Sequence, residues 1–467
     1  MSDMTRVVDS EHTIAAIATP PGAGGVGVIR ISGPLSLDIL RKIFQPHVVG
    51  RRLDSHRMIY GWIVNPATGK PLDEVMAVFM KAPYSYTRED VVEIQCHGSY
   101  LILQGILELA LAAGAEFAEP GEFTKRAFLN GRIDLTRAEA VLELLQARTK
   151  EGLDLALDQL QGQLNDTITT IRTALITVRA ILEVAIDFPD EDVEILDQQG
   201  LLKQLSESVR EPLQELIADA DQGSLYREGV SAVILGRPNV GKSSLLNGLL
   251  REERAIVTEI PGTTRDTIEE YINIKGMPVR VIDTAGIRET VEAVEEIGIK
   301  MARDRLQKAD LVLLLVDATR PPDDEEADLA HNVTDKPVLI VINKTDLVDT
   351  VDLGLYEKSF PSRPIIEISA KTGAGIDHLQ EAVFAAVTGG SSWEPGHCCV
   401  PNLRQKKALE KSLAAVVRVE NGLRQNLPAD LIAIEVQSGL DHLGDIIGET
   451  TAEDVLDMIF DQFCIGK

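Results

Sequence analysis

Short apolar runs separated by turn residues make up roughly the first 130 residues of the chain. Runs of this length, rich in Val and Ile, are typical of β-strands. Four of them stand out, at residues 13–18, 26–31, 74–80 and 91–96. Proline and glycine at positions 20–22 indicate a turn between the first two. The pattern predicts a small N-terminal α+β domain that extends to about residue 132.

Helical periodicity replaces this pattern from about residue 137. Apolar side chains then recur every three or four residues, at Leu157, Leu160, Leu164, Ile168, Ile171, Leu175, Val178 and Leu182. Helical spacing returns at residues 201–220, 402–424 and 451–463, and Thr451 with Asp454 predicts an N-terminal cap for the last helix. An apolar stripe must be covered, so we expect residues 133–225 and 386–467 to form one discontinuous all-α domain. Two separate bundles are the alternative.

Between these helical segments, short apolar runs end in polar loops. We expect buried strands at residues 230–235, 279–282, 338–342 and 365–368. Open α/β sheets bind their ligands at the carboxyl ends of such strands. Residues 226–385 are therefore predicted to be an α/β domain inserted into the helical one.

The first of these strands leads into the pattern G-x-x-x-x-G-K-S at residues 236–243. A strand, a glycine-rich loop and a helix in this order let backbone N–H groups surround nucleotide phosphates. In such a loop Lys242 reaches the β and γ oxygens, and the Ser243 hydroxyl binds Mg²⁺. The inserted domain is thus predicted to be a Ras-like P-loop domain.

Two later loops carry residues that select a base. N-K-T-D follows the third strand at residues 343–346, and S-A-K follows the fourth at residues 369–371. In this order they resemble the base-reading loops of translation-factor-like GTPases. The Asp346 carboxylate can accept hydrogen bonds from both N1 and N2 of guanine, donors that adenine lacks. GTP is the predicted nucleotide.

Further metal contacts are expected from two segments between these loops. Asp283, in D-T-A-G at residues 283–286, supplies a carboxylate behind Mg²⁺, and Gly286 lies at the γ-phosphate. A threonine of the segment 260–266 should bind Mg²⁺ through its hydroxyl; Thr264 is the first choice and Thr263 the alternative.

The residue that orients the attacking water is not the usual one. Many small GTPases place glutamine directly after D-x-x-G, but Ile287 stands there in this chain. A carboxylate from the acidic stretch 289–296 is one substitute, and a solvated loop without that role is the alternative.

Length and composition limit the number of domains, the kind of RNA contact and the expected location of the protein. A chain of 467 residues suggests two to four domains. A net charge of −27 argues against broad wrapping of nucleic acid, so any RNA contact must be local or assisted by a partner. The longest apolar run, residues 311–316, is far below the ~20 residues needed to cross a bilayer, and the first 12 residues lack a signal-peptide pattern. We therefore expect a cytoplasmic protein without a membrane partner, whose cysteines are free thiols rather than metal ligands.

Several further motifs make the whole chain similar to one family. They are T-P-P-G at 19–22, P-G-E-F-T at 120–124, R-A-F-L-N at 126–130, G-T-T-R-D at 262–266 and F-C-I-G-K at 463–467. Together with the phosphate loop they resemble the tRNA modification GTPase MnmE (TrmE) family. The resemblance implies a homodimer that works with the FAD enzyme MnmG in a hetero-oligomer on certain tRNAs. It implies that an aminomethyl-type (carboxymethylaminomethyl) group is installed at C5 of the wobble uridine, with the carbon taken from a 5-formyl or 5,10-methylene tetrahydrofolate.

The resemblance also implies roles for individual residues. The N-terminal domain would support dimerisation and bind folate through Arg30, Glu93, Arg132 and Lys467. K⁺ would be held by Asn239, Thr258, Ile260 and Thr263 when two G domains meet across the dimer. The catalytic residues would be Glu295, which orients water, with Asn239, Lys242, Thr264 and Asp283. The expected GTP contacts are Asn239, Val240, Gly241, Lys242, Ser243, Ser244, Thr258, Thr263, Thr264, Asp283, Gly286, Asn343, Lys344, Asp346, Ser369, Ala370 and Lys371.

Two other functions stay open at this point. One is a ribosome-assembly GTPase whose flanking parts bind RNA; such proteins usually have a basic KH-like tail with G-x-x-G. Residues 402–467 instead hold 7 Lys and Arg against 11 Asp and Glu and lack that motif. The other is a nucleotide-switched scaffold without transfer chemistry. The last residues are expected to be a docked tail, since the terminal C-I-G-K is a poor prenylation signal.

Overall fold

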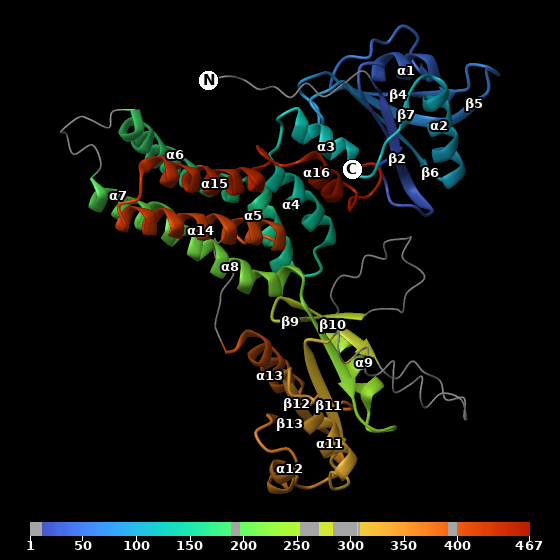
Figure 1. Cartoon of the computed structure of the whole chain (residues 1–467). Helices are drawn as coiled ribbons and strands as arrows, with labels where there is room; N and C mark the ends of the chain where they lie inside the picture. Colours follow the sequence, from blue (N-terminus) through green and yellow to red (C-terminus); the bar gives the residue numbers. More distant parts are fainter. Residues whose placement is uncertain (1–11, 188–196, 253–269, 284–305, 307–308, 391–398) are drawn as a thin grey trace, which may run out of the picture.

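The structure is a computed structural model that describes residues 12–187, 197–252, 270–283, 306, 309–390 and 399–467. Its three parts are an N-terminal α+β domain, a helical domain and an α/β domain built on a second sheet, which lie apart in Figure 1. Within these described ranges, no helix is both long and apolar enough to span a bilayer.

The N-terminal domain is built on a seven-stranded sheet of order β3-β4-β5-β6-β2-β1-β7. Its strands are β1 (Ile14–Ile17), β2 (Gly24–Ser32), β3 (Phe44–Pro46), β4 (Met58–Val64), β5 (Pro71–Met80), β6 (Val91–Gly98) and β7 (Glu116–Phe117). Neighbouring strands are antiparallel except β1 and β7. Helices α1 (Ser36–Ile43) and α2 (Tyr100–Ala112) share one apolar core with the sheet. All four predicted strands are confirmed.

The sequence pattern did not indicate β4. Its exposed side chains include the aromatic residues Tyr60 and Trp62, while Ile59 and Ile63 on either side of this pair are buried. Without polar residues on the open face, the strand lacks the alternation by which a half-buried strand is recognised.

The end of the chain returns to the N-terminal domain. Helix α16 (Glu453–Phe460) packs near α3 (Glu122–Leu129), and Figure 1 shows both helices and the C-terminal end of the chain beside the N-terminal sheet. Ile465 forms an isolated antiparallel bridge with Pro120. The Phe123 N–H donates a hydrogen bond to the carbonyl oxygen of Lys467 at 3.1 Å. The predicted docked tail is therefore confirmed.

The predicted cap of the last helix is wrong. Helix α16 begins at Glu453 with Ala452 at its N-cap, and no side chain caps it. The Thr451 hydroxyl instead donates to the carbonyl oxygen of Asp445 at 3.0 Å. The Thr451 hydroxyl, predicted to cap α16, is therefore bonded to the end of the preceding helix.

Helices on both sides of the inserted domain form one helical domain. They are α4 (Leu135–Gln146), α5 (Lys150–Gln161), α6 (Gln163–Asp187), α7 (Gln198–Leu205), α8 (Glu211–Arg227), α14 (Leu403–Arg424) and α15 (Ala429–Ile447), with a π-helical turn at Ser206–Arg210 between α7 and α8. Residues of α6, α7, α8, α14 and α15 share a single apolar core. The discontinuous domain is confirmed, and the alternative of two separate bundles is wrong.

The predicted apolar stripe holds only within α6. Its members from Leu164 to Leu182 are buried, whereas Leu157 is 38% exposed. Gly162, with a φ of 99°, ends α5, so the stripe crosses from one helix to another with a different axis. Helix α5 instead buries Leu155 and Ala156.

In its described residues, the inserted domain has a six-stranded sheet of order β13-β12-β11-β8-β10-β9. Its strands are β8 (Val230–Leu235), β9 (Glu270–Ile274), β10 (Met277–Asp283), β11 (Leu311–Asp317), β12 (Val338–Asn343) and β13 (Ile365–Glu367). Among the strands that the structure describes here, only β9 pairs antiparallel. Helices α9 (Lys242–Glu252) and α13 (Ile376–Thr388) cover one face, and α11 (Asp324–Asn332) and α12 (Leu353–Ser359) cover the other. The α/β prediction is confirmed, and burial on both faces explains the apolar strands.

A buried polar cluster marks the point where the chain enters and leaves this domain. Arg227, the last residue of α8, donates to the carbonyl oxygen of Val400 on the returning chain. Its guanidinium also pairs with Glu143 of α4 at 3.0 Å. Burial raises the pKa of Glu143 to about 7, although Arg227 acts in the opposite direction. Arg227 therefore links the chain segments that enter and leave the inserted domain, and its ion pair with Glu143 attaches both to α4.

Candidate functional site

The phosphate loop lies between β8 and α9, at the carboxyl end of a central parallel strand. Lys242 begins α9, and its ammonium donates to the carbonyl oxygens of Gly236 and Arg237, both at 2.8 Å. Asn239, midway along the loop, is exposed and has a left-handed φ of 64°. Ser243 lies exposed in the first turn of α9. Backbone N–H groups, a cation and a hydroxyl converge here, as a polyphosphate requires.

Asn343 joins the phosphate loop to the base-reading loops. Its side chain is buried at the end of β12, and its Nδ2 donates to the carbonyl oxygen of Val240 at 2.7 Å. Its Oδ1 accepts from the Ala370 N–H at 2.9 Å. Gly241 packs against the same amide, because a Cβ at that position would lie 2.2 Å from Asn343 Nδ2. One side chain thus fixes the spacing between phosphate and base contacts.

The carboxylate predicted to read guanine is held in place. The Ser369 hydroxyl donates to Asp346 Oδ1 at 2.7 Å, and Ser369 itself is buried. In the described part of the chain, no residue donates to Asp346 Oδ2. The exposed Asp346 therefore presents acceptor positions toward solvent, as a base with two neighbouring donors requires.

Sequence reasoning missed Asp317, at the end of β11. Its Oδ2 accepts from the Lys344 ammonium at 2.6 Å, and Lys344 has a left-handed φ of 69°. Burial opposes ionisation, but the hydrogen bonds from Lys344 and Thr319 hold the pKa of Asp317 below its usual value. Asp317 therefore orients Lys344. The signal was present in the sequence, since a carboxylate directly follows the longest apolar run.

Several predicted residues lie outside the described part of the chain. They are Thr258, Ile260, Thr263, Thr264, Gly286 and Glu295. Of the remaining ones, Asp283 ends β10, where its backbone is in register with Ile234 of β8, next to the phosphate loop. Lys371 is exposed after β13.

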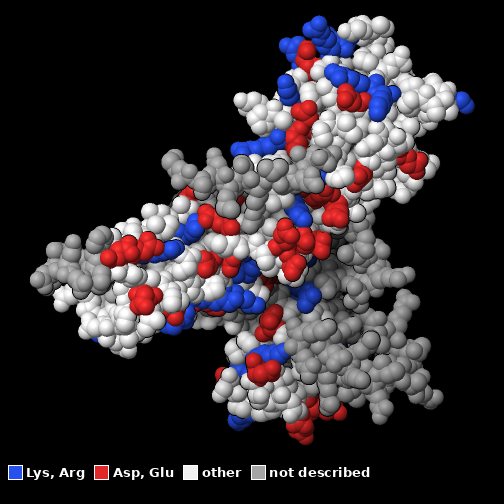
Figure 2. Space-filling model, turned by 45° about the horizontal axis from the view of Figure 1, so that its top comes forward, with Lys and Arg blue, Asp and Glu red and all other residues white. Residues whose placement is uncertain are grey.

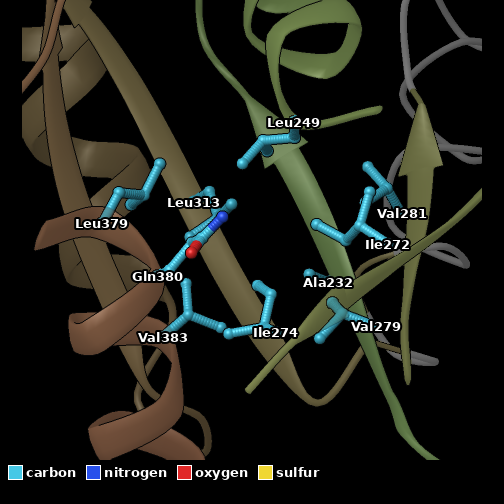
Figure 3. Close-up of a pocket in the computed structure, with 10 residues that line it drawn as sticks. All are labelled: Ala232, Leu249, Ile272, Ile274, Val279, Val281, Leu313, Leu379, Gln380 and Val383. Carbon is cyan, nitrogen blue, oxygen red and sulfur yellow. The ribbon is translucent and has the colours of Figure 1, made fainter. Parts of the chain in front are cut away.

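A separate apolar crevice lies between the sheet of this domain and α13 (Figure 3). Every lining residue except Gln380 is apolar, including Ile272, Ile274 and Val383. It belongs to the domain core. It offers nothing to a phosphate or a base, so the nucleotide site remains at the strand ends.

The second group of predicted residues meets in the N-terminal domain. Arg30 and Glu93 are directly opposite each other on β2 and β6, and their side chains form an ion pair at 2.9 Å. Arg30 also donates to the carbonyl oxygen of Gly466 in the docked tail at 3.3 Å. Three of the four segments predicted to bind folate are therefore in direct contact, although Lys467 takes part here only through its backbone bond to Phe123.

Arg132 joins this group through an aromatic ring. Its guanidinium lies 4.6 Å from the centre of the Tyr86 ring and donates to the Tyr86 carbonyl oxygen at 3.1 Å. The Arg30 guanidinium lies 5.5 Å from the same ring and 5.6 Å from that of Phe123. Sequence reasoning missed Tyr86, which no motif singles out. Planar rings beside cations and one carboxylate suit a flat heterocycle that carries acidic groups.

Comparison with known proteins covers the whole chain. The family model "GTP-binding protein TrmE N-terminus" matches residues 13–132, and "MnmE helical domain" matches residues 135–464. A tRNA modification GTPase MnmE from Desulfotalea psychrophila is 52% identical over 98% of both chains. One from Natranaerobius thermophilus is 46% identical over 98% of this chain and all of its own. A structure of Era from Aquifex aeolicus, 29% identical, covers 40% of this chain and 66% of its own with a TM-score of 0.29.

Proposed function

Because this chain belongs to the MnmE family of tRNA modification GTPases, and is accordingly a GTP hydrolase that acts in tRNA modification, we propose its specific reaction. With the FAD-dependent partner MnmG it installs an aminomethyl-type (carboxymethylaminomethyl) group at C5 of the wobble uridine of certain tRNAs. The carbon comes from a tetrahydrofolate. We further propose that the protein is a cytoplasmic homodimer. Its N-terminal domain would comprise residues 1–132, its helical domain residues 133–225 and 386–467, and its G domain residues 226–385.

In the proposed hydrolysis, the chain's own groups position GTP and water. Lys242 exchanges its contacts with two loop carbonyls for the β and γ oxygens. Asp346, held by Ser369, accepts from guanine. Glu295 orients the water that attacks the γ-phosphorus.

Two cations belong to this proposal. Mg²⁺ would be held by Ser243 and Thr264, with the Asp283 carboxylate behind it, and K⁺ by Asn239 with oxygens of residues 258, 260 and 263. Both supply positive charge where negative charge grows between the β and γ oxygens. The Asn239 side chain in the phosphate loop is exposed. This exposure is consistent with a K⁺ site that closes when two G domains meet.

The folate part rests on one observation, the contact of Arg30 with both Glu93 and the terminal tail. In the proposed site, the docked tail would bring Lys467 toward Arg30, Glu93 and the rings of Tyr86 and Phe123. Arg30, Arg132 and Lys467 would then bind the acidic end of the folate, and Glu93 would accept from its ring nitrogens. The rings of Tyr86 and Phe123 would pack against its flat part.

Turnover in different salts tests the hydrolysis mechanism. We expect GTP hydrolysis at saturating Mg²⁺ to be faster in K⁺ than in Na⁺ at equal ionic strength, and Asn239→Ala to remove this preference. Equal rates of the wild-type chain in both salts would rule out the K⁺ site.

Transfer of labelled carbon tests the modification. Intact chain, MnmG, GTP, substrate tRNA and a tetrahydrofolate labelled at its one-carbon unit should yield label on the wobble uridine. A modified tRNA without label would show that the chain is a nucleotide-switched scaffold and that the carbon comes from elsewhere.

A further inference from the structure

The N-terminal domain has a charge balance unlike the rest of the chain. The chain as a whole carries −27. Between residues 41 and 57, however, five Lys or Arg stand against one Asp. Figure 2 shows Lys and Arg gathered on the end of the N-terminal domain, while acidic side chains are frequent on the helical domain.

Two neighbouring loops carry the basic side chains. The connection between β3 and β4 contains Arg51 and Arg52, and the connection between β5 and β6 begins with Lys81. The Lys81 N–H donates to Ser55 Oγ at 2.9 Å. The His56 N–H donates to the carbonyl oxygen of Phe79 at 2.7 Å. The two loops are therefore held side by side.

The acidic residues of these loops are engaged elsewhere. Asp54 lies 3.6 Å from Arg57, Glu89 is buried against Arg126, and Asp90 accepts from the Ala82 N–H. Arg51, Arg52 and Lys81 are exposed and form no ion pair with any residue that the structure describes. Three cations on fixed loops are thus left for an external anion.

An aromatic ring accompanies them. Tyr84 is 78% exposed, and its N–H donates to the Lys81 carbonyl oxygen at 3.0 Å. Exposed aromatic rings beside Lys and Arg are typical of surfaces that bind single-stranded nucleic acid, because bases stack on the ring while the cations contact phosphates. The exposed ring together with these cations therefore fits an unstacked base flanked by phosphates.

We propose that Arg51, Arg52, Lys81 and Tyr84, here named the basic loop surface, bind the backbone and an unstacked base of the substrate tRNA. The inference rests on the proposed function and names the surface by which an acidic chain contacts RNA. The strongly negative net charge argues against broad wrapping of RNA, but it allows a local contact of this kind.

Salt dependence of tRNA binding by the intact chain tests the proposal. Each phosphate contact contributes about −0.7 to −0.9 to the slope of log K against log salt. Arg51→Gln with Arg52→Gln should therefore flatten the slope by about 1.4 to 1.8. Tyr84→Ala should weaken binding by about 5- to 100-fold, and Tyr84→Phe should stay within about twofold of wild type.

A matched control removes two cations from another face. Lys407 and Lys411 are exposed on α14, have no ion pair with a described residue, and change the net charge equally when replaced by Gln. That variant should keep the wild-type slope. Three results would overturn the proposal: no tRNA binding by the wild-type chain at about 50 mM salt, an equal loss in the control, or an unchanged slope in the Arg51/Arg52 variant.

The outcome is separable from that of the proposed function. If the Arg51/Arg52 variant modifies tRNA as well as wild type, the surface is refuted and the function stands. If it binds tRNA normally but loses MnmG, the surface is a protein interface and the proposal is wrong. If the wild-type chain supports no modification at all, the proposed function itself fails.

Discussion

Replacing Gly241 by alanine should damage nucleotide binding through Asn343. At this position φ is 102°, a conformation that L side chains rarely adopt, and the new Cβ would lie 2.2 Å from Asn343 Nδ2. The amide cannot simply move aside, because it is buried and bonded to both Val240 and Ala370.

The magnitude follows from these two effects. Backbone strain of this type costs about 1–3 kcal/mol. Turning the amide away leaves the buried Val240 carbonyl without its donor, which costs about 1–3 kcal/mol more. Together the two effects cost about 2–6 kcal/mol, and if at least about 2 kcal/mol of this appears in binding, GDP affinity falls by at least about 30-fold.

Fluorescent-GDP titration of the full chain measures the effect, with Gly248→Ala as the control. Gly248 lies in α9, the helix that follows the phosphate loop, and a Cβ there would meet only the Ala370 carbonyl oxygen at 3.7 Å. The control should bind GDP within about threefold of wild type, since alanine in a helix is favourable. GDP binding by Gly241→Ala within the same threefold range would refute the argument that Asn343 is pinned.

Three further changes probe other contacts. Asp346→Asn should weaken GTP binding and favour a xanthine nucleotide, because one acceptor of the carboxylate becomes a donor. The control is Asp349→Asn in the same loop. Unchanged GTP affinity of Asp346→Asn would remove Asp346 from base recognition. Gly466→Ala should displace the tail, because its Cβ would lie 2.3 Å from the Ile17 carbonyl oxygen. The variant should therefore lose folate binding in calorimetry but keep GTP hydrolysis. Equal folate affinity in the variant and the wild-type chain would show that the tail is not part of the folate site. Glu143, with its pKa raised to about 7, holds a proton in the folded chain that the unfolded chain releases above its ordinary value of 4.5. Its contribution to stability therefore falls as pH rises from about 4.5 to 7, by roughly 2–3 kcal/mol, and Glu143→Gln should remove this part of the pH dependence of thermal unfolding; the same pH dependence in both chains would contradict the shift.

The sequence predicted best where the chemistry is contiguous. Lys242 follows its glycine loop directly, and Asp346 lies three residues after Asn343, so the order of neighbours is enough to assign them. Asp317 and Tyr86 were missed because each acts on a residue distant in sequence, Lys344 and Arg132 respectively. The position of Asp317 after an apolar run was visible in the sequence, but its partner, like that of Tyr86, is determined by packing, which no local pattern contains.

The errors have the same origin. Thr451 has the right residue type for a helix cap, but the end of α15 offers its hydroxyl a nearer acceptor. Leu157 continues a numerical spacing across Gly162, where the chain changes direction. In both cases tertiary contacts overrode a local preference.

The division of the helical core between two distant segments affects how the protein is made. Helices α6 to α8 leave the ribosome long before α14 and α15, which cover their apolar faces. At about 5–20 residues per second, this delay is on the order of ten seconds or more. The inserted domain can fold during that interval, because its core is formed from its own residues. The nascent helices meanwhile expose their leucines to solvent and to other chains, so this protein should depend on chaperones during synthesis more than a protein with a contiguous helical bundle.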